Sequence, residues 1–435
     1  MKKKFNVILL MFIIVFLLVA PGCKTGGGNG EDPPDPTTYT LAVWLGDGVE
    51  GTPAAGEYSY TAGQSASYDF QLETGYFDLT VTLNGEDVSD SGTVTMDKNY
   101  TLNASSGSSA DLFVSKNGDD NNNGQSEDSA FKTITRAFQA AQPGDTIYAA
   151  AGTYNESLTL EYFGGNNAPI TLRGASAAAA ANGVPAAAET ILDGQNSRTW
   201  AFWGENCKNL TFENLHIRNY TDVGIGFYLS SQITLRNLMV RNNGAAVVHA
   251  DWEWEGYGIH MDMCSNIYIL SNTAYRNGPP PGGSKEVIMG TGIDTFGCTD
   301  STIKYNLSYE NNGGGFLIED GVNVLFEGNR AFDNNCDASA DEWWDAGLWV
   351  DGGHDITIRN NIFCGNLGAG IQISDEDFQE PYGYILEDNS SYDNYYGIYI
   401  WNFGTNDWPP ENKIKRSGNQ FYNNTVLDVW ILDWE

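Results

Sequence analysis

The stretch NLSYENNGGGFLIEDGVNVLFEGNRAFDN, residues 306–334, decides the fold of this chain because it contains one complete repeat. It opens with an Asn motif, N-x-x-aromatic-x-N, at Asn306, and the next copy begins at Asn329, 23 residues further on. Two short apolar segments, GFLIED and VNVLFEG, lie between the copies. A period near 23 residues with strands in each repeat is typical of one turn of a three-sided coil of β-strands.

The Asn motif recurs along the second half of the chain. Its copies begin at Asn214, Asn237, Asn272, Asn306, Asn329, Asn361, Asn389 and Asn419, with successive spacings of 23, 35, 34, 23, 32, 28 and 30 residues. We expect each first Asn to stack on its equivalent about 4.8 Å away, so that the buried amides satisfy one another. Crossovers between parallel strands are right-handed. Residues 110–435 are therefore predicted to form a right-handed parallel β-helix, a solenoid of the all-β class.

A helix is predicted at the start of this solenoid. The apolar residues that recur at helical spacing are Phe131, Ile134, Ala137, Phe138 and Ala141. Asp128 or Ser129 supplies the N-cap, and Gly144 ends the helix. The helix is expected to cover the open end of the coil, where backbone groups would otherwise lack partners. Together with the segment GDTIYAAAGTY, this stretch resembles the N-terminal cap of secreted right-handed β-helix proteins.

The first 105 residues contain an export signal, a tether and a separate domain. Three lysines and an apolar run precede Ala-Pro-Gly-Cys, so residues 1–23 are predicted to be a lipoprotein signal peptide with Cys23 as the lipidated residue. An ordinary cleaved signal or a plain anchor is the alternative. Residues 24–38 form a Gly/Pro/acidic tether, and residues 39–105 alternate like a small antiparallel β domain. We expect an extracytoplasmic protein, anchored to the membrane through Cys23 and facing the periplasm or the cell surface.

The formal net charge of −34 restricts the possible partners. So acidic a surface repels nucleic acid and anionic membranes, and it repels polyanionic glycans unless a cation intervenes. Five cysteines remain besides Cys23. Cys264 and Cys298 occupy equivalent positions on neighbouring turns, where a stacked thiol pair fits better than a disulfide. We expect a monomer that does not bind nucleic acid.

Each turn also carries a strand that begins with Gly, and period-two alternation separates its inward from its outward side chains. One outward column holds His260, Asp294, Leu317, Trp349, Gln372 and Tyr399. The other holds Asp262, Phe296, Glu319, Asp351, Ser374 and Trp401. The titratable members of both columns gather into one patch, in which stacked carboxylates repel one another. One of a close pair must then have a raised pKa or hold a cation. The alternative is that each is a solvated surface acid.

Aromatic residues are concentrated beside this acidic patch. We expect long insertions in several turns to form a wall that carries Trp252, Trp254, Trp343 and Trp344. Trp349, Tyr399 and Trp401 are predicted to form the floor of the groove. Exposed rings stack on the C–H faces of sugars while carboxylates bind the hydroxyls. The pattern therefore predicts a sugar-binding groove, and the alternative is that each ring packs against the base of its own loop.

Two carboxyl groups that flank a bond are the usual equipment for glycoside hydrolysis. Glu319 is central to the patch and is the candidate general acid/base, with Asp294 or Asp351 as its partner. Asp262 and His260 complete the candidate catalytic set. The segment GTGIDTFGCTDSTIKYNLSYENNGGGFLIED, residues 290–320, resembles the central rungs of glycoside hydrolases in the pectate-lyase-like superfamily of parallel β-helix proteins. That resemblance implies a polysaccharide partner and catalysis by an Asp on one rung and an acid on the next. A hydrolase of this kind requires no cofactor.

The same scaffold supports other reactions, so the fold alone does not decide the chemistry. A Ca²⁺-dependent polysaccharide lyase or a uronate epimerase is the first alternative, with Ca²⁺ held by the carboxylates. The rung pattern also resembles family-nine pectate lyases, which carry a base Lys on a Gly-led strand. The corresponding outward residue here is Trp349, which counts against that type and leaves His260 or Lys285 as the base. The second alternative is a non-catalytic glycan-binding or adhesion protein.

Overall fold

The computed structural model describes residues 37–433 except 47, 74–75, 109, 166–167, 176–188, 246–252, 280–286, 337–345 and 377–379. The predicted signal peptide with Cys23 and nearly all of the tether lie outside the described residues. So do Trp252, Trp343, Trp344 and Lys285. Within the described part, no helix is long and apolar enough to cross a bilayer.

Residues 38–108 form two small sheets around a core of their own. The first has the order β3 (Gly56–Thr61), β1 (Thr38–Leu45), β8 (Tyr100–Ser108), β5 (Tyr76–Leu83) and β6 (Glu86–Val88), and the second has the order β2 (Val49–Thr52), β4 (Ser65–Leu72) and β7 (Ser91–Thr95). Neighbouring strands are antiparallel as predicted, except that β1 and β8 run parallel. In β4 the residues Ala66, Tyr68 and Phe70 are buried and those between them are exposed, as the alternation requires.

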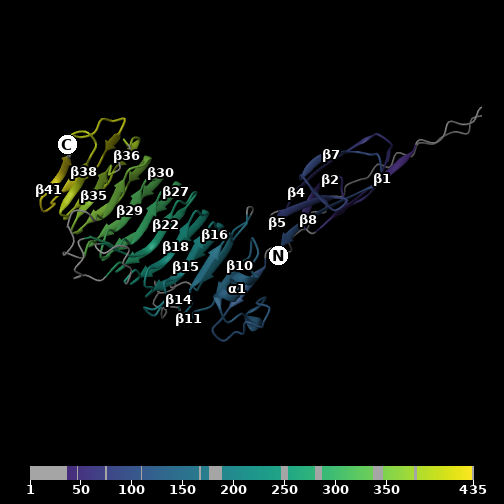
Figure 1. The fold of residues 1–435 in the computed structure, drawn as a ribbon, viewed down its shortest axis with the longest axis horizontal. Helices are drawn as coiled ribbons and strands as arrows, with labels where there is room; N and C mark the ends of the chain where they lie inside the picture. The colour runs from purple at the N-terminus through teal and green to yellow at the C-terminus, as the bar shows by residue number, and fades with distance from the viewer. Residues whose placement is uncertain are drawn as a thin grey trace, which may run out of the picture.

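The following residues form a solenoid of three long parallel sheets, so the predicted parallel β-helix is confirmed (Figure 1). Equivalent strands stack along the long axis of the solenoid, and each turn pairs with the next. The first sheet consists of β9 (Asp111–Val114), β10 (Thr146–Ala149), β13 (Ile170–Gly174), β16 (Lys208–Glu213), β19 (Ser231–Arg236), β23 (Tyr268–Leu270), β27 (Thr299–Lys304), β30 (Val322–Glu327), β33 (His354–Arg359), β36 (Tyr384–Glu387) and β39 (Ile414–Ser417).

The other two sheets follow the same order along the solenoid. The second sheet consists of β11 (Gly152–Tyr154), β14 (Thr190–Asp193), β17 (His216–Arg218), β20 (Met239–Arg241), β24 (Thr273–Tyr275), β28 (Leu307–Tyr309), β31 (Arg330–Phe332), β34 (Ile362–Cys364), β37 (Ser390–Tyr392) and β40 (Gln420–Tyr422). The third consists of β12 (Leu158–Glu161), β15 (Trp200–Glu205), β18 (Val223–Tyr228), β22 (Tyr257–Asp262), β26 (Ile293–Phe296), β29 (Phe316–Glu319), β32 (Leu348–Asp351), β35 (Ala369–Ser374), β38 (Tyr396–Trp401) and β41 (Leu427–Leu432).

Two insertions lie side by side, as the idea of a wall requires. Their short strands β21 (Glu253–Glu255) and β25 (Val287–Met289) belong to consecutive turns and pair in parallel. The backbone of Trp254 lies in β21.

The predicted inward column of the third sheet is confirmed. It runs through Ile259, Ile293, Phe316, Leu348, Ile371 and Ile398, all buried in one continuous core. Burying each such side chain contributes roughly 1.5–3 kcal/mol. The Gly that leads each strand has a steric reason: a Cβ on Gly258 would lie 2.5 Å from the Gly292 carbonyl oxygen and 2.8 Å from Asn277 Nδ2.

The Asn ladder is confirmed from Asn272 to Asn419. Asn306 Oδ1 accepts hydrogen bonds from the backbone N of Asn272 at 2.8 Å and from its Nδ2 at 3.1 Å, and this pattern repeats on each following turn. A second ladder, five positions later in the motif, was not predicted. It passes through Asn243, Asn277, Asn311, Asn334, Asn366, Asn394 and Asn424.

The prediction was wrong for Asn214 and Asn237, which lie outside the ladder. In the pairing register Met239 lies opposite Thr273, so Leu238 occupies the position that Asn272 occupies on the next turn. Leu238 N accordingly donates a hydrogen bond to Asn272 Oδ1 at 2.9 Å. In the sequence, the shift is reflected in the spacing of 35 residues from Asn237 to Asn272, which is one residue more than the 34 from Asn272 to Asn306.

The predicted capping helix is present but shorter than expected. α1 (Ile134–Ala140) has Thr133 as its N-cap, whose side chain accepts a hydrogen bond from a backbone N–H of the first turn. Asp128 and Ser129 were predicted as caps, but they belong to a separate 3₁₀ turn, η1 (Glu127–Ser129). Side chains on the inner face of α1 are buried in the solenoid core, so the helix covers the first turns as expected.

The cysteines of the described residues are free thiols, and the expected thiol pair is confirmed. Cys264 and Cys298 are both buried and share a hydrogen bond across neighbouring turns.

Candidate functional site

The outward columns of the third sheet form the candidate site, and the strand register confirms their predicted alignment. In the first column His260 of β22 lies opposite Asp294 of β26. In the second column Glu319 of β29 lies opposite Asp351 of β32. Opposite residues are one rung apart, about 4.8 Å. The sheet therefore places four titratable residues from four separate turns on one face.

His260 and Asp294 form an ion pair through Nδ1 and Oδ2. Burial opposes a positive charge on the imidazole, but the Asp294 carboxylate outweighs it and raises the pKa of His260. The second carboxylate oxygen of Asp294, Oδ1, is buried and has no hydrogen-bond partner among the described residues. One oxygen of Asp294 is therefore held by His260, while the other is buried without a partner among the described residues.

Two aromatic rings fix the imidazole of His260. Tyr257 stacks on it with ring centroids 4.7 Å apart, and Trp203 stacks with centroids 6.2 Å apart. Trp203 lies two rungs away, and Gly226 is the residue between them in the register. A Cβ on Gly226 would lie 2.8 Å from the Trp203 ring, so the glycine is what allows this stacking. The sequence prediction missed Tyr257 and Trp203. Gly226 could have indicated the contact, because a glycine in a column of larger residues leaves room for a neighbouring ring.

Glu319 is partly buried beside two other acids. Burial raises the pKa of Glu319 to about 8, and the negative charges of Asp294 and Asp351 add to the effect. A carboxyl group with such a pKa is protonated at neutral pH and can donate its proton. The expectation that one of the stacked acids must have a raised pKa is met by Glu319.

Asp351 is held in a hydrogen-bonded network. Its Oδ1 accepts hydrogen bonds from Ser374 Oγ and from the backbone N of Glu376, the latter at 3.1 Å. The indole N–H of Trp349 donates in turn to Ser374 Oγ at 2.7 Å. Burial nevertheless raises the pKa of Asp351, because these two donors only partly offset the loss of water. Asp351 therefore has structural partners that Asp294 Oδ1 lacks.

Asp262 lies apart from the other acids of its column. Phe296 separates it from Glu319 in the register, so the two carboxyl groups are not neighbours. Burial raises the pKa of Asp262, with the positive charge of His260 opposing this and the charge of Asp294 adding to it. Asp262 Oδ1 is buried without a hydrogen-bond partner in the described part of the chain. Asp262 belongs to the edge of the patch, beside His260.

The prediction that three aromatic residues form the exposed floor of a groove is wrong. Trp349, Tyr399 and Trp401 are only 6%, 0% and 6% exposed. They form a hydrophobic cluster outside the coil, in which Tyr399 stacks on Trp430 with ring centroids 4.4 Å apart. The physical reason is that large outward rings on neighbouring strands bury more apolar area against one another than against water. These rings pack the surface beside the site and do not present their faces to a sugar.

Gln372 is an unexpected feature of the first column. It lies between Trp349 and Tyr399 in the register and is fully buried. Neither Oε1 nor Nε2 has a hydrogen-bond partner among the described residues. A buried amide without partners is costly, so its presence in an aromatic column requires an explanation. Aligning the Gly-led strands of this chain on their glycines already placed Gln372 at this position. A single amide between two aromatic residues of the column was the signal in the sequence.

The donor set does not fit a metal ion. Among the described residues, no three His, Cys, Asp or Glu side chains converge closely enough to hold one. Asp294 is paired with His260, and Asp351 is occupied by Ser374 and Glu376.

Two family profiles match the chain. The profile described as "Pel9A-like, right handed beta helix region" matches residues 112–347, and the one described as "Right handed beta helix region" matches residues 288–426. Both descriptions give the coil the right-handed sense that was predicted.

The chain resembles other proteins in sequence and in structure. An uncharacterized protein of Bacillus subtilis (strain 168), YwoF, is 28% identical over 343 residues, which cover 73% of this chain and 70% of YwoF. The crystal structure of pectate lyase Pel9A aligns with a TM-score of 0.52 and 19% identity, covering 74% of this chain and 78% of that one. An alginate lyase from Paenibacillus sp. str. FPU-7 aligns with a TM-score of 0.50 and 16% identity, covering 68% and 95%. At these identities the two solved structures show a common fold.

Proposed function

The chain belongs to the Pel9A-like right-handed β-helix family, and from that premise we propose that it is an enzyme that cleaves glycosidic bonds in a polysaccharide. The two solved proteins with this fold that are named above are a pectate lyase and an alginate lyase. A fold shared with lyases supports a carbohydrate substrate and leaves the reaction to be argued from the site.

The observation that carries the proposal is an acid that keeps its proton on a strand next to one that holds a second carboxyl group. Glu319, with a pKa of about 8, keeps its proton at neutral pH. Asp294 pairs with His260 and has one oxygen without a hydrogen-bond partner among the described residues. The two residues are diagonal in the register, roughly 8 Å apart at Cα from strand spacings of ~4.8 Å and ~6.6 Å. A carboxyl group that keeps its proton close to a second carboxyl group is suited to the acid role of such a pair.

Hydrolysis follows from these two roles. Glu319 donates its proton to the glycosidic oxygen as the bond from that oxygen to the anomeric carbon breaks. Asp294 Oδ1 accepts a proton from a water molecule whose oxygen adds to the anomeric carbon, or it attacks that carbon directly. After direct attack, water that gives its proton to Glu319 hydrolyses the glycosyl ester and releases Asp294. His260 keeps Asp294 oriented, and the ring of Tyr257 keeps His260 in place. Asp351 raises the pKa of Glu319 through its charge and takes no proton itself.

The test is release of reducing sugar from a panel of neutral and uronate polysaccharides. We expect Glu319→Gln and Asp294→Asn each to lower kcat by at least a hundredfold, because each removes a proton-transfer group. Glu310→Gln is the matched control, since Glu310 lies on the same turn but pairs with Arg276 on the exposed surface. Full activity in Glu319→Gln would refute the assignment, and glycan binding without any product would indicate a non-catalytic protein.

A polysaccharide lyase is the second candidate, and His260 is the feature that favours it. In its neutral form the imidazole can remove the proton next to a uronate carboxylate, which begins elimination, so the raised pKa of His260 would shift this reaction toward alkaline pH. Elimination yields an unsaturated product that absorbs in the ultraviolet, whereas hydrolysis does not. A product that absorbs in the ultraviolet would establish the lyase, provided that mass spectrometry shows no water molecule added on cleavage. Loss of activity with a chelator would add a metal requirement that the hydrolytic mechanism does not have.

We also propose that the enzyme is anchored outside the cytoplasm by a lipid on Cys23. The motif Ala-Pro-Gly-Cys at residues 20–23 supports this proposal. Cys23→Ser is expected to shift the protein from the membrane fraction to the soluble fraction. Unchanged membrane association in that variant would favour an uncleaved anchor.

A further inference from the structure

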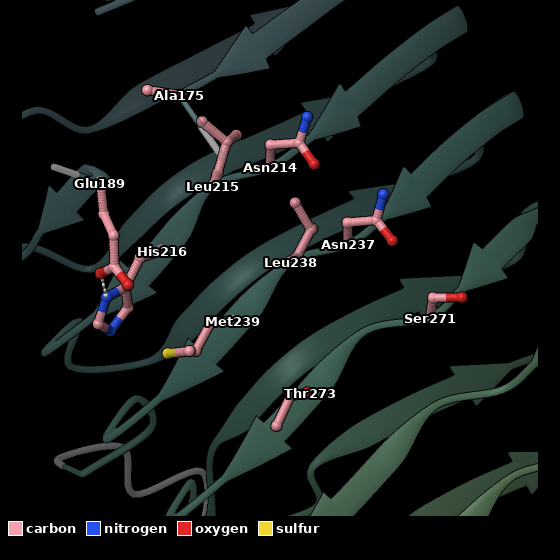
Figure 2. Close-up of a pocket in the computed structure, with 10 residues that line it drawn as sticks. All are labelled: Ala175, Glu189, Asn214, Leu215, His216, Asn237, Leu238, Met239, Ser271 and Thr273. Atoms are coloured by element: carbon pink, nitrogen blue, oxygen red, sulfur yellow. Dashed lines mark hydrogen bonds and ion pairs between the residues drawn. The ribbon is translucent and has the colours of Figure 1, made fainter. Parts of the chain in front are cut away.

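A hollow lies on a different part of the solenoid from the candidate catalytic face. It is a cavity of about 310 Å³ at the corner between the first and second sheets, spanning four consecutive turns (Figure 2). Its lining comes from the first residues of β17, β20 and β24, from the turns before them, and from Ala175 and Glu189 between β13 and β14. This volume is at the lower end of the range for small-molecule sites.

A row of polar residues lines the cavity along the corner between the two sheets. These residues are not part of the Asn ladder. Asn214, Asn237 and Ser271 occupy equivalent turn positions with φ of 59°, 54° and 56°. Because the motif is shifted by one residue here, the Asn214 and Asn237 amides project from the corner (Figure 2). Within the described part of the chain, neither amide has a hydrogen-bond partner in the protein. Two copies of the strongest sequence motif thus serve the cavity and not the core.

A second row runs parallel to the first along the strands. His216, Met239 and Thr273 are opposite one another in the register, so their side chains repeat at rung spacing, about 4.8 Å. The row offers the thioether of Met239 and the hydroxyl of Thr273, while both ring nitrogens of His216 are engaged within the protein. Together with the corner row it gives the hollow hydrogen-bonding groups on two sides.

The deep end of the cavity is polar but carries no net charge. His216 Nδ1 donates to Glu189 Oε2 at 2.9 Å, and Arg241 Nε donates to His216 Nε2 at 2.9 Å. An imidazole that accepts from a guanidinium is neutral, so a cation and an anion flank a neutral ring. Burial lowers the pKa of His216, which is consistent with the neutral form. In a chain of net charge −34, this end of the cavity is balanced and neither attracts nor repels ions strongly.

We propose that this cavity binds an uncharged mono- or disaccharide, as a glycan-holding site separate from the catalytic face. Side-chain amides and hydroxyls donate and accept as sugar hydroxyls require, and Met239 offers apolar surface to C–H groups. A uronate would meet the carboxylate of Glu189, and the guanidinium groups nearest to His216, those of Arg241 and Arg218, are already engaged by His216 and Asp193. The site lies on different sheets from Glu319, so it does not depend on the proposed reaction.

The test is binding of cellobiose, xylobiose and mannobiose, with digalacturonate as the charged comparison, to the full-length protein by calorimetry or saturation-transfer NMR. Thr273→Trp fills the cavity, and Leu307→Trp is the matched control because Leu307 is the next residue of the same column and lies outside the lining. Asn237→Asp is a second variant that tolerates the positive φ but removes the amide donor.

The expected result is that at least one neutral disaccharide binds more tightly than digalacturonate. Thr273→Trp and Asn237→Asp each weaken this binding at least tenfold, while Leu307→Trp and Glu319→Gln retain it. Polysaccharide turnover at saturating substrate is unchanged in Thr273→Trp. Absence of binding by all three neutral sugars, or equal binding in both cavity variants, would overturn the proposal. Because Glu319→Gln is included, failure of the hydrolase assignment is distinguished from failure of the second site.

Discussion

Glu319 must hold a proton to act as the general acid, so the pH dependence of the rate reports on it directly. With its pKa at about 8, kcat/KM is expected to fall as the pH rises through 8, because the ionised form cannot donate. A profile of initial rates between pH 5 and 10 measures this. The exposed control Glu310→Gln should have the same profile as the wild type. A rate that stays level from pH 7 to 9.5 would show that Glu319 is not the acid.

Gln372 gives a second prediction about a single residue. Its amide is fully buried without a partner in the described residues, so Gln372→Leu removes an unsatisfied group from an apolar cluster. We expect the free energy of unfolding to rise by about 1–3 kcal/mol. Gln420→Leu, on an exposed strand, should change it by less than about 0.5 kcal/mol. Loss of activity in a stabilised Gln372→Leu would show that the amide serves the substrate.

The alignment of single residues was predictable, but their exposure was not. His260, Asp294, Glu319 and Asp351 meet on one face because successive Gly-led strands keep a common register, and the Gly with the alternation after it can be read locally in the sequence. The burial of Tyr399 depends on Trp430, which comes from the last strand and has no motif that announces it. The face of the sheet to which a side chain points follows from the periodicity of the strand. The group that covers that side chain comes from a segment far away in the sequence.

At the scale of the element, the corrected ladder predicts unequal effects for two Asn residues of one motif. Asn329→Ala removes the acceptor of Asn306 N at 2.9 Å and of Asn306 Nδ2 at 2.9 Å, inside the core. We expect a loss of about 2–4 kcal/mol in the free energy of unfolding. Asn237→Ala removes no ladder bond and costs about 1 kcal/mol for the positive φ. Equal losses in chemical denaturation would contradict the shift.

Elements were predictable where two signals coincide. Six strands of the third sheet, from β22 to β38, have a Gly at or just before their start and alternating apolar residues, and these strands are found where they were expected. The start of α1 was misplaced because Ser126, Asp128, Ser129 and Thr133 are all acceptable caps, and η1 uses the first of them. The one-residue shift at Asn214 and Asn237 was missed because the motif letters are unchanged by it. The pairing of Met239 with Thr273 shows it, and in the sequence it is reflected in the spacing of 35 residues after Asn237.

For the whole molecule, the titratable groups of the site predict that stability falls as the pH rises. Glu319 has a folded pKa of about 8 against 4.5 when unfolded, so folding binds an extra proton in this interval. The stability it contributes is complete below pH 4.5 and is lost as the pH rises through 8, by an amount on the order of a few kcal/mol. The raised pKa of His260 acts in the same direction, with stability lost above 6.5.

Titratable groups elsewhere in the solenoid determine how the stability changes at acidic pH. Glu213 accepts hydrogen bonds from Arg173 and Arg236, which outweigh burial and lower its pKa, so its contribution is present above 4.5 and lost as the pH falls further. The unfolding temperature is therefore expected to be highest in mildly acidic solution and to decline toward pH 9. Glu319→Gln should flatten the alkaline decline, because its amide does not titrate, and Glu310→Gln should not. An unfolding temperature that rises from pH 6 to pH 9, measured by calorimetry, would contradict the assignment of a protonated Glu319 in the folded protein.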